Sequence, residues 1–223
     1  MSEIIWNEPS IRKAMQVYFI TGSNNCLKDP LHVLEEAIKG GITLFQFREK
    51  GSGALSGDAM QELAYEMRQL CRRHGVPFVV NDDVELALAI DADGVHVGQE
   101  DEAAAEVRRR IGSRLLGVSA YNRAEAEAAI RCGADYLGVG PLFATTTKED
   151  AKSASGLHVL KELRDIGIRI PIVGIGGITA ANAGDVIRSG ADGVSVITAI
   201  SHAEQPADAA RELLQAVHIA AAR

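Results

Sequence analysis

The stretch ADGVHV (92–97) opens a short apolar run, and related stretches, ADYLGV (134–139) and ADGVSVI (191–197), open two further runs. Gly133 and Gly190 stand just before the second and third stretches, where a glycine can end the preceding helix in a left-handed conformation. The three stretches therefore predict turns from a helix into a strand. We expect these turns at the end of the fold opposite the active site.

Outward from these stretches, short apolar runs alternate with amphipathic segments, which is typical of βα units around a parallel sheet. The apolar runs predict strands at Val17–Thr21, Thr43–Phe47, Phe78–Asn81, Gly94–Val97, Leu115–Ser119, Tyr136–Val139, Ile172–Ile175 and Val194–Ile197. The amphipathic segments predict helices at Leu31–Lys39, Ala59–Arg73, Ala103–Arg110, Arg123–Arg131, Leu157–Asp165, Ala181–Arg188 and Ala207–Ala221. Eight strands in 223 residues predict an α/β fold, the (β/α)8 TIM barrel.

No linker or low-complexity segment divides the chain. We therefore expect a single barrel domain over residues 1–223, with a short N-terminal extension over about 1–16. Hydrophobic residues make up 47% of the sequence but aromatic residues only 4%, so aliphatic side chains must fill the core. The longest irregular segment, 143–155, follows the sixth predicted strand, and its length is typical of a functional lid or an insertion.

The formal net charge of −7 argues against nucleic acid or an anionic membrane as the main partner, because both favour a basic surface. No apolar stretch approaches the roughly 18 residues of a membrane span, and no signal peptide is recognisable. The three cysteines form no C-x-x-C pair, which indicates reduced thiols. We expect a cytoplasmic protein that acts on small molecules, and the sequence leaves open whether it is a homo-oligomer.

The second predicted strand ends in a cluster of polar side chains. Side chains alternate across a strand, so Gln46, Arg48 and Lys50 share one face while Phe45 and Phe47 share the other. The phenylalanines can pack against helices, which leaves the polar groups to point into the barrel mouth, where a TIM barrel has its active site. Guanidinium and ammonium groups both suit phosphate. The alternative is a solvated strand end, which the interleaved phenylalanines disfavour.

Two carboxylates follow the third and fourth predicted strands. Asp82 and Asp101 can meet across adjacent strand ends, and their hard oxygen ligands suit Mg2+. For either residue alone, capping of a helix N-terminus is the favoured role, although Asp83 is the better cap for the helix that follows, and spacing does not choose between the two roles. Ser119, at the end of the fifth strand, can donate a hydrogen bond to a ligand oxygen, although a serine that closes a strand is more often a turn or cap residue.

The later loops offer an anion site. Residues 145–148, TTTK, place three hydroxyls and an ammonium in succession, although a plain solvated loop would look the same. Loops after the seventh and eighth strands of a barrel often bind phosphate, and Gly176 and Gly177 would let the backbone approach a ligand closely. The six histidines show no metal-ligand spacing. His96 either lines the barrel or is a hydrogen-bonded core residue.

Seven motifs extend along the chain in a fixed order. They are QFREK (46–50), VNDD (80–83), DGVHVGQED (93–101), GVS (117–119), GP followed by TTTK (140–148), GIGGIT (174–179) and DGVSVITAIS (192–201). Together they resemble the thiamine-phosphate synthase family between Tyr18 and Ser201. Three positions depart from the family pattern: Tyr121 stands where histidine is frequent, Ala144 where proline is frequent, and Thr198 where serine is commoner.

The resemblance implies a transferase of thiamine biosynthesis that couples a pyrimidine diphosphate with a thiazole phosphate and releases pyrophosphate. The implied ligands of the aminopyrimidine and its pyrophosphate are Gln46, Arg48, Lys50, Asn81, Ser119 and Lys148, of which Arg48, Lys50, Ser119 and Lys148 are catalytic. Asp82 and Asp101 would hold Mg2+. The implied thiazole-phosphate ligands are Thr145, Thr147, Gly177, Ile197 and Thr198. Phe47, Glu49 and Thr146 complete the predicted substrate-binding set.

Two other functions stay open at this point. One is a thiazole tautomerase-like barrel without coupling activity, which would need no metal or pyrophosphate site. The other is a non-catalytic sensor of a phosphate ligand. The sequence also leaves open whether the thiazole substrate carries a carboxylate.

Overall fold

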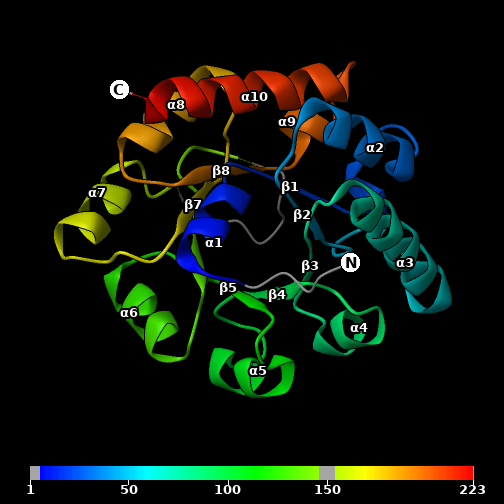
Figure 1. Ribbon diagram of the computed structural model, residues 1–223, viewed down its shortest axis with the longest axis horizontal. Helices are drawn as coiled ribbons and strands as arrows, with labels where there is room; N and C mark the ends of the chain where they lie inside the picture. The colour runs from blue at the N-terminus through cyan, green and yellow to red at the C-terminus, as the bar shows by residue number, and fades with distance from the viewer. Residues whose placement is uncertain (1–5, 146–153, 223) are drawn as a thin grey trace.

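The computed structural model describes residues 6–145 and 154–222, and its strands form one closed parallel barrel in chain order, with β8 pairing to β1 (Figure 1). The strands are β1 (Val17–Thr21), β2 (Leu44–Phe47), β3 (Phe78–Asn81), β4 (Gly94–Val97), β5 (Leu115–Ala120), β6 (Tyr136–Val139), β7 (Ile172–Ile175) and β8 (Gly193–Val196). The predicted TIM barrel is confirmed, and every predicted strand lies within one residue of its observed bounds.

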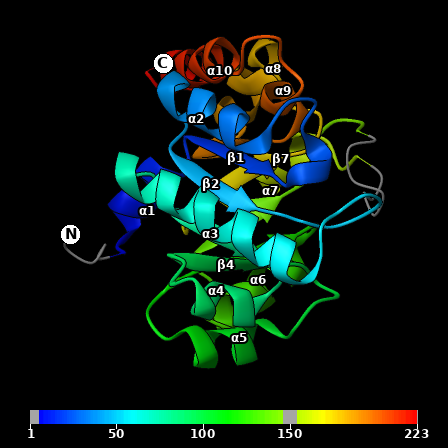
Figure 2. The same cartoon turned by 90° about the vertical axis from the view of Figure 1, so that its right-hand side faces the viewer.

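Helices surround the barrel; α2 and α3, for example, lie outside β1 and β2 in side view (Figure 2). The helical elements are α1 (Glu8–Ala14), η1 (Ser23–Asn25), α2 (Pro30–Gly40), α3 (Gly57–His74), α4 (Val84–Ala89), α5 (Ala104–Ile111), α6 (Arg123–Arg131), α7 (His158–Asp165), α8 (Ala180–Arg188), α9 (Thr198–Ser201) and α10 (Pro206–Ala221). The seven helices predicted with bounds are confirmed, and so is the helix expected after Asp83, α4, while α1, η1 and α9 are additions. None of the helices within the described ranges is long and apolar enough to span a lipid bilayer.

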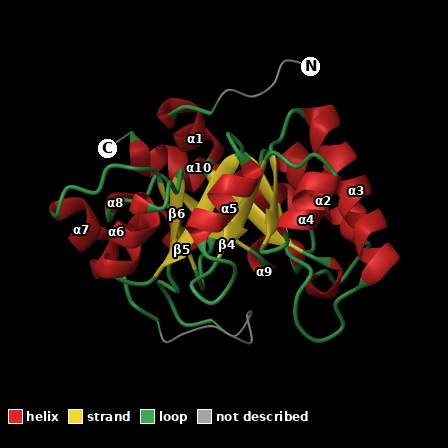
Figure 3. Ribbon diagram, turned by 90° about the horizontal axis from the view of Figure 1, so that it is seen from below, coloured by secondary structure: helices red, strands yellow, loops and turns green. Residues whose placement is uncertain are grey.

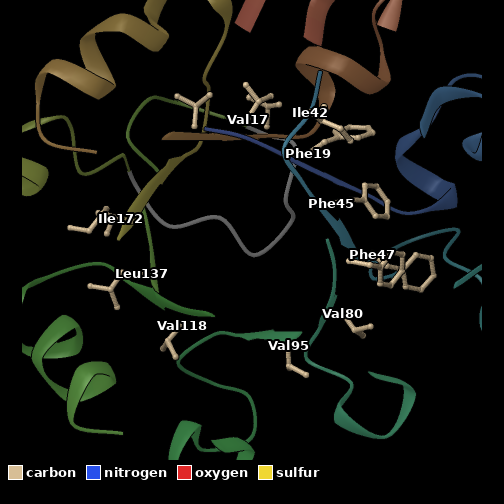
Figure 4. Close-up of a cluster of buried hydrophobic side chains, with 14 of the residues drawn as sticks. Val17, Phe19, Ile42, Phe45, Phe47, Val80, Val95, Val118, Leu137 and Ile172 are labelled. Atoms are coloured by element: carbon tan, nitrogen blue, oxygen red, sulfur yellow. The ribbon is translucent and has the colours of Figure 1, made fainter. Parts of the chain in front are cut away.

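Strand side chains alternate between two layers, as their period of two requires. Outward-facing residues such as Phe45, Val80 and Leu137 point away from the centre of the ring and pack under the helices (Figure 4). Inward-facing residues such as Tyr18 and Leu115 form a second cluster inside the barrel. Side chains therefore fill the interior of the barrel along part of its length.

The short helix α1 covers the end of the barrel where the strands begin. Its residues Ile11 and Ala14, with Met15, pack against the inner cluster. Asn7 and Ser10 form a reciprocal capping box that fixes the start of the helix. Figure 3 shows α1 and α9 at opposite ends of the barrel, so the end where the strands finish is the one that can open to a ligand.

Asp93, Asp135 and Asp192, the aspartates of the repeated stretches, join neighbouring strands at the end covered by α1, which we call the closed end. Each of them precedes one strand and accepts a backbone N–H at the start of the strand before it. The bonds are Phe78 N to Asp93 (2.8 Å), Leu116 N to Asp135 (2.7 Å) and Ile172 N to Asp192 (2.8 Å). The prediction that these stretches build turns at the non-catalytic end is confirmed, and each aspartate also links one pair of strands.

An arginine from a nearby helix completes each of these links. Arg164, on α7, donates to Asp192 at 2.7 Å and to the carbonyl oxygens of Gly190, Ile168 and Ile170 at 2.8 to 2.9 Å. Burial lowers the pKa of Arg164 from its ordinary value, although Asp192 opposes the shift. Arg108, on α5, likewise donates to Asp135. Arg68, on α3, forms the third ion pair, with its Nε 4.0 Å from Asp93 Oδ2.

Candidate active site

Side chains from all eight strand ends line one cavity at the open end of the barrel. The predicted site residues that line it are Gln46, Arg48, Lys50, Asn81, Asp82, Asp101, Ser119, Thr145, Gly177, Ile197 and Thr198. Tyr121, one of the departures from the family pattern, lines it too. The structure therefore brings together residues that lie up to about 150 positions apart in the sequence.

The end of β2 presents two polar side chains to the cavity from within the barrel wall. Gln46 is 1% exposed and Arg48 is 6% exposed. The backbone N–H of Arg48 donates to Thr21 O at 2.9 Å, which extends the pairing of β1 with β2 beyond the end of the strand. This bond holds Arg48 in the alternation of the strand, so the predicted shared face of Gln46, Arg48 and Lys50 is confirmed.

An acidic pair lies beside Lys50 at the ends of β3 and β4. Lys50 Nζ donates to Asp82 Oδ2 at 2.9 Å and lies 3.6 Å from Asp101 Oδ1. Asp82 has a positive φ of 63°, which is uncommon for a residue with a side chain. Asp83, as predicted, caps α4 by accepting from Leu86 N at 2.9 Å. Capping is therefore the role of Asp83, and Asp82 and Asp101 face the cavity.

The two carboxylates titrate as an interacting pair. Burial, together with the neighbouring Asp101, raises the pKa of Asp82 although Lys50 opposes the shift. Burial works against the charged form of Asp101 too, but hydrogen bonds with Asp82, Gly98 N–H and Lys50 outweigh it and lower the pKa of Asp101. The hydrogen bond to Asp82 raises the pKa of Lys50. The positive charge of Lys50, which lies within 3.6 Å of both carboxylates, stabilises the negative charge of the pair.

The acidic pair has the chemistry of a magnesium site. Magnesium is usually bound through one or two carboxylates while it keeps waters and contacts substrate phosphates. Asp82 and Asp101 supply two such carboxylates on adjacent strand ends. Within residues 6–145 and 154–222, no cluster of three or more His, Cys, Asp or Glu side chains forms a cage for a metal ion. The donors present fit an ion that shares its coordination with a phosphorylated substrate.

A chain of four hydrogen bonds crosses the barrel beneath the cavity. Gln46 Nε2 donates to Tyr18 OH (2.5 Å), Tyr18 OH bonds Tyr136 OH (2.8 Å), and Tyr136 OH bonds His96 Nδ1 (3.0 Å). His96 Nε2 bonds Ser119 Oγ at 3.0 Å. His96 thus lines the cavity and is hydrogen-bonded in the core at once. Sequence reasoning missed both tyrosines, although Tyr18 occupies an inward position of β1.

Gly176 and Gly177 shape the loop after β7. Both have positive φ, 96° and 64°, which favours glycine. A Cβ on Gly176 would lie 2.5 Å from Pro141 Cβ, and one on Gly177 would lie 2.7 Å from Ala144 O. These glycines are therefore required for the loops after β6 and β7 to pack together at the rim, a reason that differs from the predicted approach to a ligand.

Two residues of the predicted substrate-binding set have side chains that lie away from the cavity, and their role in binding stays a prediction. Phe47 faces the helix layer, as the alternation of β2 dictates, and is 2% exposed in the outer core (Figure 4). Glu49 follows the strand and turns toward the β1 loop, where it accepts from Ser23 N and Leu55 N, each at 2.7 Å. Glu49 therefore ties two loops together.

The remaining predicted residues divide into two groups. Ile197 and Thr198 lie where β8 leads into α9, at the cavity wall. Thr146, Thr147 and Lys148 lie outside the described residues, so their predicted roles stay predictions.

Comparisons with known proteins agree with this architecture. The sequence model of the family described as thiamine monophosphate synthase matches residues 17–200. The thiamine-phosphate synthase of Geobacillus kaustophilus is 60% identical over 213 residues (96% of each chain), and that of Bacillus cereus strain 03BB102 is 56% identical over 217 residues (97% of this chain and 98% of the relative). The solved thiamine phosphate pyrophosphorylase of Pyrococcus furiosus superposes with a TM-score of 0.85 at 36% identity, covering 94% of this chain and 98% of its own.

Proposed function

This chain belongs to the thiamine monophosphate synthase family, and from that premise we propose how its barrel mouth performs the coupling reaction of a thiamine-phosphate synthase. The enzyme is a transferase of thiamine biosynthesis. It joins 4-amino-2-methyl-5-hydroxymethylpyrimidine diphosphate to a thiazole phosphate, and it releases thiamine phosphate and pyrophosphate. The observation that carries the proposed mechanism is the gathering of Arg48, Lys50, Asp82 and Asp101 around one cavity.

The reaction breaks the bond between the pyrimidine methylene carbon and the pyrophosphate oxygen, and the thiazole nitrogen then forms a bond to that carbon. The aminopyrimidine ring is electron-rich and stabilises the positive charge on the methylene carbon, so pyrophosphate departs before the thiazole attacks. The attacking nitrogen has no proton to lose, so the enzyme needs no general base. The protein's main task is to stabilise the negative charge of the departing pyrophosphate.

The β2 end and its neighbours carry out this task. Arg48 and Lys50 supply fixed positive charge, and Lys148 is proposed to add a third cation. Ser119 donates a hydrogen bond to a pyrophosphate oxygen, while Gln46 and Asn81 orient the pyrimidine. Mg2+, held by Asp82 and Asp101, would supply Lewis-acid stabilisation of the pyrophosphate. Binding both substrates in line converts a bimolecular step into a nearly unimolecular one, which lowers the barrier by up to about 7–11 kcal/mol.

The opposite side of the cavity is proposed to bind the thiazole phosphate. The loops after β7 and β8 would contribute Gly177, Ile197 and Thr198. The loop after β6 would contribute Thr145, Thr146 and Thr147. Loops in this position commonly bind phosphate in TIM barrels. Tyr121 stands beside Ser119 in the cavity wall and would shape the thiazole side of the pocket.

We also infer the setting in which the enzyme works. Its substrates are small molecules, and the charge of −7 supports neither nucleic acid nor an anionic membrane as a partner. Free thiols at Cys26, Cys71 and Cys132 support a reducing compartment, the cytoplasm. Residues 1–223 are proposed to be a single domain, in which α1 belongs to the barrel as its end cover.

A direct coupling assay tests the function. The purified chain is incubated with both substrates and Mg2+, and thiamine phosphate and pyrophosphate are quantified by chromatography. Reactions lacking one substrate, and a reaction with a chelator, are the controls. Equal amounts of both products support the synthase. Ligand binding without pyrophosphate release would instead indicate a sensor, and conversion of the thiazole alone would indicate a tautomerase.

The Asp101→Asn variant should need at least about tenfold more Mg2+ for half-maximal activity, because it loses one of two anionic ligands. The asparagine can still accept from Gly98 N–H, which Asp101 Oδ2 binds at 2.8 Å, so the turn is kept. The measurement is a Mg2+ titration of the coupling rate. Glu100→Gln, at an exposed neighbouring carboxylate, is the matched control. An unchanged titration curve for Asp101→Asn would remove it as a ligand.

A further inference from the structure

The hydrogen-bond chain beneath the cavity has two possible directions, and they have different consequences for the site. We propose that it runs from Gln46 to Ser119, so that the ring proton of His96 lies on Nε2 and the Ser119 hydroxyl keeps its own proton for a substrate oxygen. The proposal rests on the proposed function for the role of Ser119. It also makes Tyr136, which does not line the cavity, a positioning residue.

The direction is set at the Gln46 end. Nε2 of a glutamine side chain is a donor only, and it lies 2.5 Å from Tyr18 OH. The Tyr18 oxygen therefore accepts at this bond, and its proton is left to point elsewhere. The oxygen of Tyr136, 2.8 Å away on the opposite side of the barrel, is the acceptor within reach.

The two tyrosines transmit this direction because each carries one proton. Tyr18 is 1% exposed and Tyr136 is fully buried. Burial raises the pKa of both phenols above the ordinary tyrosine value, so both are neutral at physiological pH. Once Tyr136 has accepted from Tyr18, its own proton points to His96 Nδ1, 3.0 Å away.

His96 links Tyr136 to Ser119 at the cavity, and its two ring nitrogens have opposite hydrogen-bonding roles. A neutral imidazole has one donor and one acceptor nitrogen, so a ring that accepts at Nδ1 donates from Nε2. Its neighbour at Nε2 is Ser119 Oγ, at 3.0 Å. A hydroxyl that accepts this bond keeps its proton, and Ser119 can donate it to an oxygen of the departing pyrophosphate.

The reverse direction would give the site the wrong polarity. Gln46 would have to present its amide oxygen to Tyr18, the His96 proton would lie on Nδ1, and Ser119 would donate its proton to Nε2. A lone pair of Ser119 would then face the oxyanion that develops on the leaving group. Preorganised donors, and not acceptors, stabilise such charge.

Nitrogen-15 NMR of the histidine rings tests the direction in the free protein at neutral pH. The His96 signals are assigned by their absence from a His96→Asn variant. We expect Nε2 of His96 to be the protonated nitrogen and Nδ1 to show the shift of an unprotonated ring nitrogen. A proton on Nδ1, or on both nitrogens, would overturn the proposal. This measurement requires no activity, so it stands apart from the outcome of the coupling assay.

The Tyr136→Phe variant tests the consequence for catalysis. It removes the donor to His96 Nδ1 but keeps the ring, so the histidine should become a mixture of tautomers and kcat should fall about tenfold. KM should change less than about twofold, because residues that touch the substrates are retained. Tyr65→Phe, at a tyrosine that is 54% exposed on α3, is the matched control.

A double variant decides whether Tyr136 acts through Ser119. If it does, Tyr136→Phe should lower kcat no further in a Ser119→Ala background, because the hydroxyl that the chain orients is gone. A second full tenfold loss in the double variant would contradict the proposal, as would an unchanged kcat in the folded single variant. Should Tyr136→Phe fail to fold, the wild-type NMR spectrum decides.

Discussion

Replacement of Arg48 by alanine should lower kcat/KM for coupling about 100- to 1,000-fold, the range expected when one preorganised donor to a developing oxyanion is lost. Arg48 is only 6% exposed and opens onto the cavity from the barrel wall. In this low-dielectric position its charge acts on pyrophosphate more strongly than a surface charge would. Steady-state kinetics with both substrates at saturating Mg2+ measures the effect.

Two controls separate charge, geometry and folding in this experiment. Arg48→Lys keeps the charge but loses the planar fork, so it should recover part of the loss and remain below the wild type. Arg72→Ala, on the exposed side of α3, should leave kcat/KM unchanged. Thermal unfolding establishes that each variant is folded at the assay temperature. A folded Arg48→Ala variant with full activity would refute the proposed role of Arg48.

Replacement of Asp192 by alanine should destabilise the barrel by about 3 kcal/mol without changing the activity of the folded molecules. The variant leaves the Arg164 guanidinium without its carboxylate and Ile172 N–H without its acceptor. Arg12, on α1, also loses its ion pair with Asp192. These groups are largely buried at the closed end, so the loss exceeds that of a surface ion pair.

Urea denaturation followed by circular dichroism measures the change in the free energy of unfolding. The Glu127→Ala variant is the control, because it breaks the exposed Arg123–Glu127 pair on α6 and should cost less than about 0.5 kcal/mol. The kcat of Asp192→Ala, measured well below its unfolding transition, should match the wild type. A loss of stability no greater than that of the control would show that the aspartate links are dispensable.

The sequence predicted the barrel well because the period of each segment agrees with its final environment. On β5, for example, Leu115 lies in the cluster inside the barrel, while its neighbour Leu116 lies in the layer under the helices. The helix α1 escaped prediction because only Ile11 and Ala14 among its seven residues are buried, too few to establish a helical period. The four residues of α9 are fewer still.

The candidate site was predictable where strand alternation continues and not beyond it. Gln46, Arg48 and Lys50 point into the cavity because the β2 pattern extends past the last paired residue. The direction of the Glu49 side chain was not predictable, because it depends on Ser23 and Leu55, partners that lie in other loops. Tyr136 was missed because an inward tyrosine among apolar neighbours has the same sequence pattern as an ordinary core residue.

The cover formed by α1 also determines what optical methods can detect. The chain has one tryptophan, Trp6, and it packs against the inner cluster beside this helix, at the end of the barrel remote from the mouth. Intrinsic fluorescence excited at the indole should therefore follow undocking of the N-terminal segment and global unfolding. Substrate arrival would leave the emission nearly unchanged, so titrations of ligand affinity require an extrinsic reporter attached at the opposite rim.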